Sequence, residues 1–242
     1  MDKLIIKEVT KLRDKDKGAF TMRFFRTGKG EYGEGDIFYG LTVPASRKIA
    51  SKYIEIDLKD LEKVIQNKVH EIRLIALIIL NTKYKKAKTE KECEALVKFY
   101  LKNIPYINNW DLVDVSAYNI LGAYLKDKNL ARNASAGGDR SILIKLSQSR
   151  KLWSERIAIV STFAFIKNND LDLIFYFGEY FLNHKHDLIH KALGWMLREA
   201  GKRDEKRLKE FLEKNKTKMP RTMLRYAIEK FSDKERKYFL GK

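Results

Sequence analysis

The chain has 242 residues, with 50 Lys and Arg against 32 Asp and Glu, a formal net charge of +18. A hydrophobic share of 44% excludes a disordered chain, and the single Cys93 excludes an internal disulfide framework. Apolar runs stay far short of the ~18 residues of a membrane span, so we expect a cytoplasmic protein with no membrane partner. The positive charge favours a polyanionic partner such as nucleic acid, with a lysine-rich solvated surface as the plain alternative.

The first 56 residues are predicted to hold N-terminal helices and one Gly-rich loop. Helices are expected over Asp2–Lys15 and Ala19–Arg26, the loop spans Gly28–Gly40, and Thr42-Val43-Pro44 opens a third helix. The loop contains a G-x-G-x-x-G pattern. No strand pattern precedes it and no clear helix follows directly, so we do not expect nucleotide binding there.

Residues 57–242 read as a succession of helices, and strand patterns are almost absent. Helices are predicted over Asp57–Gln66, His70–Lys85 and Thr89–Asn103, the last with a capping box between Thr89 and Glu92. The NASAGGD segment, residues 133–139, is expected to be a loop between two later helices. Further helix starts are predicted near Asn109, Asp139, Leu152, Asp170, Asp187, Asp204 and Met219.

Some of these helices look alike, which indicates a repeat. Ala76, Ala158 and Ala192 each follow a basic residue within an apolar stretch, and Ala158 and Ala192 lie 34 residues apart. Ala76 and Ala158 lie 82 residues apart, about two steps of the ~40-residue period of helical HEAT-type repeats. The predicted fold is all-α: a single α-solenoid domain over residues 1–242, built of antiparallel helix pairs (HEAT-like repeats) with a concave basic face, in which 57–242 form the repeat core.

Three segments carry a resemblance to a known family: Asn109–Asp114, Leu152–Ile159 and Lys191–Glu199. Together they resemble the DNA alkylation repair family, the HEAT-like DNA glycosylases of the AlkD type. The resemblance implies a catalytic carboxylate and a set of lesion- and DNA-facing side chains, which fall on Asp114, Trp110, Trp195 and Arg156. One departure is Phe24, which stands where the family often has a Tyr near the DNA.

The chemistry of these residues is consistent with that role. Trp110 and Asp114 are four residues apart, so they share one helix face, and an indole beside a carboxylate suits a cationic ligand such as an alkylated purine. A fixed carboxylate stabilises an oxocarbenium-like sugar and can activate water, so neither metal nor cofactor is required. The alternative is structural: Asp114 pairs with a neighbouring helix and Trp110 is core. Four matches to the family favour the functional interpretation.

Other charged residues are candidate DNA contacts or metal ligands. Arg156 suits a phosphate beside the lesion, and Lys191 and Arg198, about one turn either side of Trp195, are further phosphate candidates. His186 and His190 have the spacing of zinc ligands on a helix, but the glutamate that would follow the first histidine is absent. We therefore expect no metal site.

The sequence thus predicts a monofunctional DNA repair glycosylase that hydrolyses the N-glycosidic bond of N3- or N7-alkylated purines and leaves an abasic site. Its partner would be double-stranded DNA containing alkylated bases, bound by a monomer that associates with the nucleoid. Two other classes stay open: a non-catalytic HEAT-like module that binds nucleic acid or protein, and a protein-binding adaptor whose charge serves solubility. Asp114 favours the enzyme, because a carboxylate beside DNA repels phosphate in a pure binding module.

Overall fold

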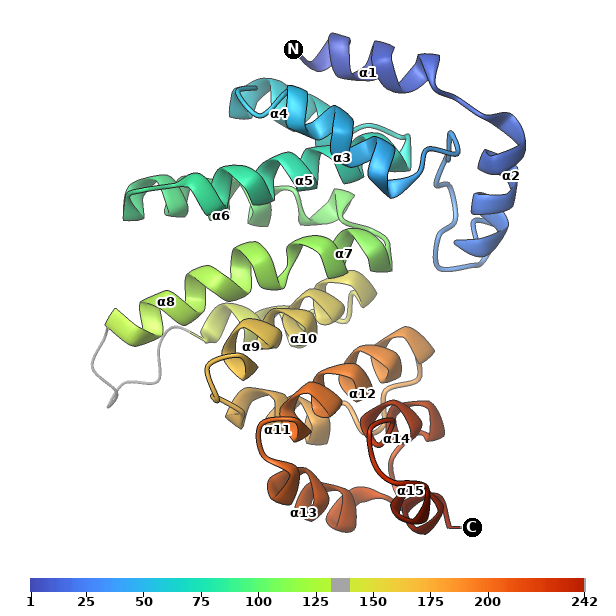
Figure 1. Ribbon diagram of the computed structural model, residues 1–242, viewed down its shortest axis with the longest axis vertical. Coiled ribbons are helices and arrows are strands. Elements are labelled where there is room, and N and C mark those ends of the chain that lie inside the picture. Colours follow the sequence, from blue (N-terminus) through green and yellow to red (C-terminus); the bar gives the residue numbers. More distant parts are fainter. Residues whose placement is uncertain (132–139, 242) are drawn as a thin grey trace. The chain divides into compact units, whose positions relative to one another are not determined.

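A computed structural model describes residues 1–131 and 140–241, and these residues fold into helices (Figure 1). Within those ranges the β pairing is limited to an isolated parallel bridge between Ile37 and Val69, so the all-α prediction is confirmed. None of the described helices is long and apolar enough to cross a membrane. The chain divides into two compact units, Met1–Ser116 and Ala117–Lys242. The single solenoid domain with a concave basic face stays a prediction.

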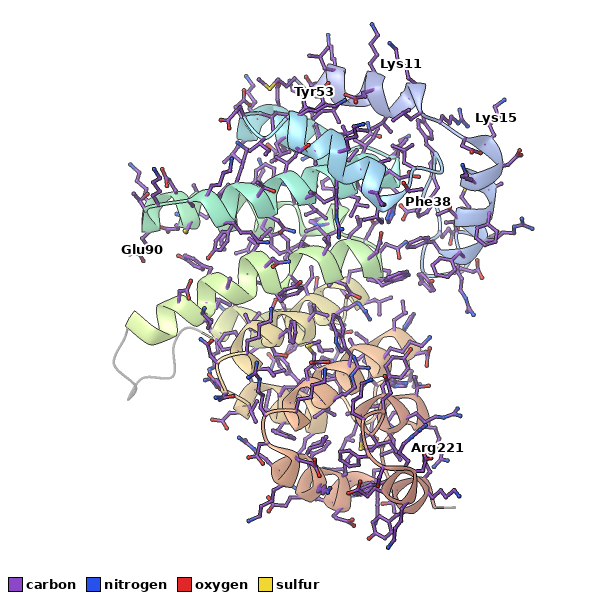
Figure 2. All side chains as sticks on the ribbon, in the orientation of Figure 1. Lys11, Lys15, Phe38, Tyr53, Glu90 and Arg221 are labelled. Atoms are coloured by element: carbon purple, nitrogen blue, oxygen red, sulfur yellow. The ribbon has the colours of Figure 1, made fainter. Side chains whose placement is uncertain are left out.

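The first unit consists of α-helices and one short 3-10 turn that precedes its last helix. They are α1 (Asp2–Lys11), α2 (Lys15–Phe24), α3 (Val43–Lys52), α4 (Leu58–Ile65), α5 (His70–Lys86), α6 (Glu90–Lys102), the turn η1 (Ile104–Tyr106) and α7 (Trp110–Ser116). The segment between α2 and α3 holds the Gly-rich loop and carries Phe38, which is labelled in Figure 2.

Side-chain caps explain where most of these helices begin. Thr42 and Asp57 accept hydrogen bonds from the backbone N–H groups three residues on, and the capping box of Thr89 forms as predicted. The prediction for the first two helices was wrong at their junction. Asp14 accepts a hydrogen bond from the backbone N–H of Lys17, so it caps α2 and ends the preceding helix early, at Lys11.

The core of the first unit surrounds α5. The apolar centre of α5 predicts a buried helix, and residues 74–77 are buried as expected. The polar side chains of its first turn, His70, Glu71 and Arg73, are buried as well. The helix packs against α3, α4 and α7 (Figure 1). This arrangement places the first turn of α5 beside α7, where two of the candidate site residues lie.

The second unit is built around α10 and α12. Its elements are the π-helical turn η2 (Tyr118–Gly122), α8 (Ala123–Ala131), α9 (Ser141–Ser147), α10 (Leu152–Ile166), α11 (Asp172–Tyr180), α12 (Asp187–Gly201), α13 (Glu205–Asn215), α14 (Arg221–Ala227) and α15 (Asp233–Leu240). The predicted helix starts agree within about two residues where the structure describes them, and α15 was not predicted. The loop predicted at residues 133–139 and the helix start predicted near Asp139 lie outside the described residues.

Two glycines allow close helix contacts in the second unit. A Cβ atom on Gly194 would lie 2.5 Å from the Cβ atom of Tyr226, and one on Gly122 would lie 2.3 Å from the carbonyl oxygen of Ser161. Gly194 therefore lets α12 and α14 approach each other, and the two helices lie side by side in Figure 1. Both positions require a residue without a side chain because backbone and Cβ atoms occupy the space.

Candidate functional site

The predicted catalytic carboxylate and its partner indole lie on α7 in the first unit. Trp110 is the first residue of α7, and its backbone N–H donates to the Asn109 side chain, with the donor nitrogen 2.9 Å from the acceptor oxygen. Asp114 follows one turn later, and both side chains are half-buried. Burial is the main reason that the pKa of the Tyr100 phenol is raised. A hydrogen bond with Ser116 opposes this shift, and the negative charge of Asp114 adds to it. The Asp114 carboxylate is thus close enough to influence a buried residue of α6.

The indole of Trp110 is braced by a row of aromatic rings. Phe25 stacks on it with a centroid separation of 5.1 Å and an angle of 7° between the ring planes. Phe38 stacks on Phe25 at 4.7 Å, and the imidazole of His70 stacks on Phe38 at 4.3 Å. Phe24, by contrast, is 60% exposed and meets Trp110 edge-on at 6.2 Å. Because Phe25 covers one face of the indole, a ligand can stack only on the opposite face.

A buried polar network lies behind these rings. His70 is almost fully buried at the start of α5, with Nδ1 3.1 Å from a carboxylate oxygen of Asp36 and Nε2 2.8 Å from one of Asp111. Asp36 also pairs with the Arg73 guanidinium and accepts a hydrogen bond from the Asn109 amide at 3.0 Å. The residues before and after Trp110 in the sequence are therefore both bound into the same network.

The Gly-rich loop is held by carboxylates. Glu71 on α5 is buried, and its carboxylate accepts hydrogen bonds from three consecutive backbone N–H groups, those of residues 39–41, at 2.7–3.1 Å. The N–H groups of Gly28 and Gly30 donate to the side chains of Glu31 and Glu34. These N–H groups already have acceptors, so the G-x-G-x-x-G pattern does not present them as a phosphate cradle.

The other four predicted site residues lie in the second unit. Arg156 on α10 is only 5% exposed, and its guanidinium donates to the backbone carbonyl of Leu188, at 2.5 Å, in the first turn of α12. Trp195 on α12 is half-buried and contacts Phe163 at a centroid distance of 6.0 Å. Arg156, which is expected to contact phosphate, thus also links α10 to α12 by a hydrogen bond.

Lys191 and Arg198 both have carboxylate partners on or near α12. Lys191 pairs with Asp187 one turn earlier, at 2.8 Å, and both side chains are exposed. Arg198 pairs with Glu199 and with Glu229, which follows α14. A phosphate would have to compete with these carboxylates, more so at Arg198 than at the exposed Lys191.

Trp195 lies in a row of half-exposed rings whose other members, Phe163 and Tyr118, were not predicted as site residues. Phe163 lies between Trp195 and Tyr118, with the Tyr118 ring edge-on at 5.2 Å. The ammonium of Lys167 lies over both rings, 5.1 Å from the Tyr118 centroid and 4.5 Å from the Phe163 centroid. The sequence spacing could have indicated Phe163, because it follows Arg156 by seven residues and so lies on the same face of α10.

The histidines of the second unit are engaged in hydrogen bonds. His184 bonds the carboxylate of Glu155 at 3.1 Å, His190 bonds the carbonyl oxygen of His184, and His186 caps α12 by accepting from the N–H of Leu188. Burial is the main reason that the pKa of His186 is lowered. Within residues 1–131 and 140–241, no group of three or more His, Cys, Asp or Glu side chains is arranged to hold a metal ion.

Comparisons with known proteins give one matching family and a solved structure of similar fold. The sequence model of the DNA alkylation repair enzyme family matches residues 5–231. Among solved structures, the chain is similar to a predicted DNA alkylation repair enzyme from Enterococcus faecalis, with a TM-score of 0.70 and 15% identity over 91% of this chain and 97% of that one. No curated protein matches the chain.

Proposed function

The chain belongs to the DNA alkylation repair enzyme family, and on that premise we propose that it is a DNA glycosylase acting on N3- or N7-alkylated purines. The observation that carries the proposal is the pairing on α7 of a half-exposed indole with a carboxylate one turn away. The proposed reaction hydrolyses the N-glycosidic bond, releases the alkylated base and leaves an abasic site in double-stranded DNA.

Trp110 is proposed to recognise the charge of the lesion. Alkylation at N3 or N7 gives the purine a formal positive charge, and a cation stacked on an indole is stabilised by about 0.5–2 kcal/mol. Phe25 holds the indole from behind at a 7° interplanar angle, so the ring keeps its orientation when a base stacks on its other face. A rigid platform loses little conformational entropy when the ligand binds.

Asp114 is proposed to act on the sugar. The charged base is already a good leaving group, so the difficult step is to stabilise the cation that develops at C1′ of the deoxyribose. A carboxylate at that point stabilises the oxocarbenium-like transition state and accepts a proton from the attacking water. The new C1′–O bond replaces the C1′–N bond, whose electron pair leaves with the base.

The second unit is proposed to contribute DNA contacts. Trp195 offers a further half-exposed ring, and Lys191 is exposed and paired only with the exposed Asp187 among the ion pairs of the described residues. Arg156 is proposed as a further phosphate contact because its guanidinium is planar and suits phosphate, although it is buried and donates to the carbonyl of Leu188. With a net charge of +18, DNA affinity is expected to fall steeply with salt.

The test is release of bases from alkylated duplex DNA by the full chain. Duplex DNA treated with a methylating agent is incubated with the protein, and the released bases are identified by chromatography. The proposal predicts free 7-methylguanine or 3-methyladenine, abasic sites in the duplex and no strand break before alkali is added. If DNA binding is salt-dependent but no base is released from either lesion, a non-catalytic binding module replaces the glycosylase.

A further inference from the structure

The environment of His70 determines its protonation state. Each of its two ring nitrogens lies within hydrogen-bond distance of a carboxylate oxygen, of Asp36 on one side and Asp111 on the other. A carboxylate is an acceptor only, so each of these contacts needs an N–H on the ring. A neutral imidazole has one N–H, whereas an imidazolium has two. Both contacts can therefore form only when the ring is positively charged.

We propose that His70, as an imidazolium bridging Asp36 and Asp111, is a positioning residue for Trp110. His70 ties Asp36 of the Gly-rich loop to Asp111 in the first turn of α7. It does not touch the DNA in this proposal; it acts through the carboxylates and rings between it and the indole. The geometric part of the inference is independent of the reaction, and its effect on base release rests on the proposed function.

Two routes connect His70 to the indole. The first is polar: Asp111 follows Trp110 in the sequence, and Asn109, bound to Asp36, precedes it. The second is aromatic, because the rings of Phe38 and Phe25 form a continuous stack between the imidazole and the indole. A displacement of the imidazole or of either carboxylate therefore moves the first turn of α7, the ring that backs Trp110, or both.

The network is electrically balanced when His70 is charged. The groups that face His70 are the carboxylates of Asp36 and Asp111, the guanidinium of Arg73, and the rings of Phe25 and Phe38. The neighbouring Glu71 carboxylate is directed to the backbone of residues 39–41. Two carboxylates then meet two cations, which is the condition under which buried charges are tolerated.

Loss of the proton would unbalance one side of the network. Oδ1 of Asp111 is buried and has no hydrogen-bond partner among the described residues. The Asp111 carboxylate is therefore held mainly by the contact of its other oxygen, Oδ2, with His70. A neutral imidazole can donate either to Asp36 or to Asp111, and Asp36 keeps Arg73 and Asn109 in either case. The contact most readily lost is therefore the one to α7.

The direction of the pKa agrees with this geometry. Burial disfavours the charged ring, but the charge and hydrogen bond of Asp111, followed by the hydrogen bond of Asp36, outweigh it and raise the pKa of His70 above 6.5. The bridge is therefore complete below pH 6.5 and is lost as the pH rises through the raised value. Trp110 should lose its orientation over the same pH range.

The experiment follows Trp110 directly by ¹⁹F NMR of the full chain labelled with 5-fluorotryptophan. The chain has three tryptophans, and the resonance of Trp110 is assigned by Trp110→Phe. Wild-type protein, His70→Gln and the control Glu71→Gln are compared between pH 6 and 9.5. Glu71 is the matched control because it is equally buried on the same helical turn but holds the loop at residues 39–41 and not α7.

In wild-type protein the proposal predicts that the Trp110 resonance titrates as the pH rises above 6.5, which needs no substitution to observe. His70→Gln should shift or broaden that resonance at pH 7 and abolish its titration, while Glu71→Gln retains the titration. A Trp110 resonance that does not titrate in wild-type protein, or that titrates equally in His70→Gln, would overturn the proposal.

Base release is measured on the same samples. His70→Gln is expected to lower the single-turnover rate by about tenfold to 100-fold, the cost of a small misplacement at a reacting centre, with DNA affinity changed less than about threefold. Unchanged base release in His70→Gln would refute the effect on catalysis. If wild-type protein releases no base while the NMR results hold, the glycosylase proposal fails and the positioning role of His70 stands.

Discussion

Substitution of Asp36 by Asn tests the buried network by its stability. The Asp36 carboxylate meets three groups that are themselves buried: His70 Nδ1 at 3.1 Å, Asn109 Nδ2 at 3.0 Å and the Arg73 guanidinium. An amide of the same shape keeps one acceptor oxygen and turns an NH₂ group toward donors. It also leaves His70 and Arg73 with a single carboxylate, Asp111, to balance two charges. Removing one partner of a buried ion pair costs about 3–5 kcal/mol.

The loss is measured by urea unfolding, followed through the fluorine resonance of Trp110, the one tryptophan of the first unit. With a dependence on urea of about 3 kcal/mol/M, the midpoint should fall by about 1 M or more. The control is Lys98→Gln, which removes an ion pair with Glu94 whose side chains are 74% and 45% exposed and which should cost less than about 1 kcal/mol. Equal midpoint shifts in Asp36→Asn and Lys98→Gln would refute the reasoning.

Three further predictions follow from other contacts. Gly194→Ala should lower the free energy of unfolding of the second unit by about 1–3 kcal/mol, measured by urea unfolding, because the added methyl group would lie 2.5 Å from the Cβ of Tyr226. An unchanged stability would contradict the close packing of α12 on α14. Because the folded-state pKa of His70 is raised, its stabilising contribution is complete below pH 6.5 and is lost as the pH rises through the raised value. The difference in thermal stability between wild type and His70→Gln should therefore shrink as the pH rises above 6.5. Glu229→Gln should tighten DNA binding about two- to fivefold at low salt, because the substitution removes one carboxylate partner of Arg198. Binding is measured by fluorescence anisotropy, and weaker binding would exclude Arg198 as a phosphate contact.

Helix type and position could be predicted from the sequence because local signals determine them. The apolar centre of α5 indicated a buried helix, and Thr42, Asp57 and Thr89 cap helices where their side chains indicated. The error at Asp14 has the same origin. An aspartate in a charged segment fits both a helix interior and an N-cap, and the backbone hydrogen bond that decides between them is visible only in the structure.

The surroundings of Trp110 could not be predicted, because they depend on residues distant in the sequence. Asp111 lies in the first turn of α7, and its carboxylate binds His70, which stands 41 positions earlier in the sequence. Phe24 drew attention through the family resemblance, whereas its neighbour Phe25 forms the stacked contact. Gly194, next to Trp195 in the sequence, is required by the packing of α12 against α14, which brings the Cβ of Tyr226 close to it. Each of these contacts is set by tertiary packing, which leaves no local pattern.

The central claim is that the Asp114 carboxylate performs the chemistry, and single-turnover base release measures this most directly. Rate constants for release of 7-methylguanine from a duplex with one lesion are compared at saturating protein for wild type, Asp114→Asn and Asp127→Asn. Asp127 is a control for lost negative charge, since its side chain is 61% exposed and pairs with Lys126. Asp114→Asn should be at least about 100-fold slower while folding and binding DNA normally, and Asp127→Asn should match wild type. Equal rates for wild type and Asp114→Asn would contradict the central claim.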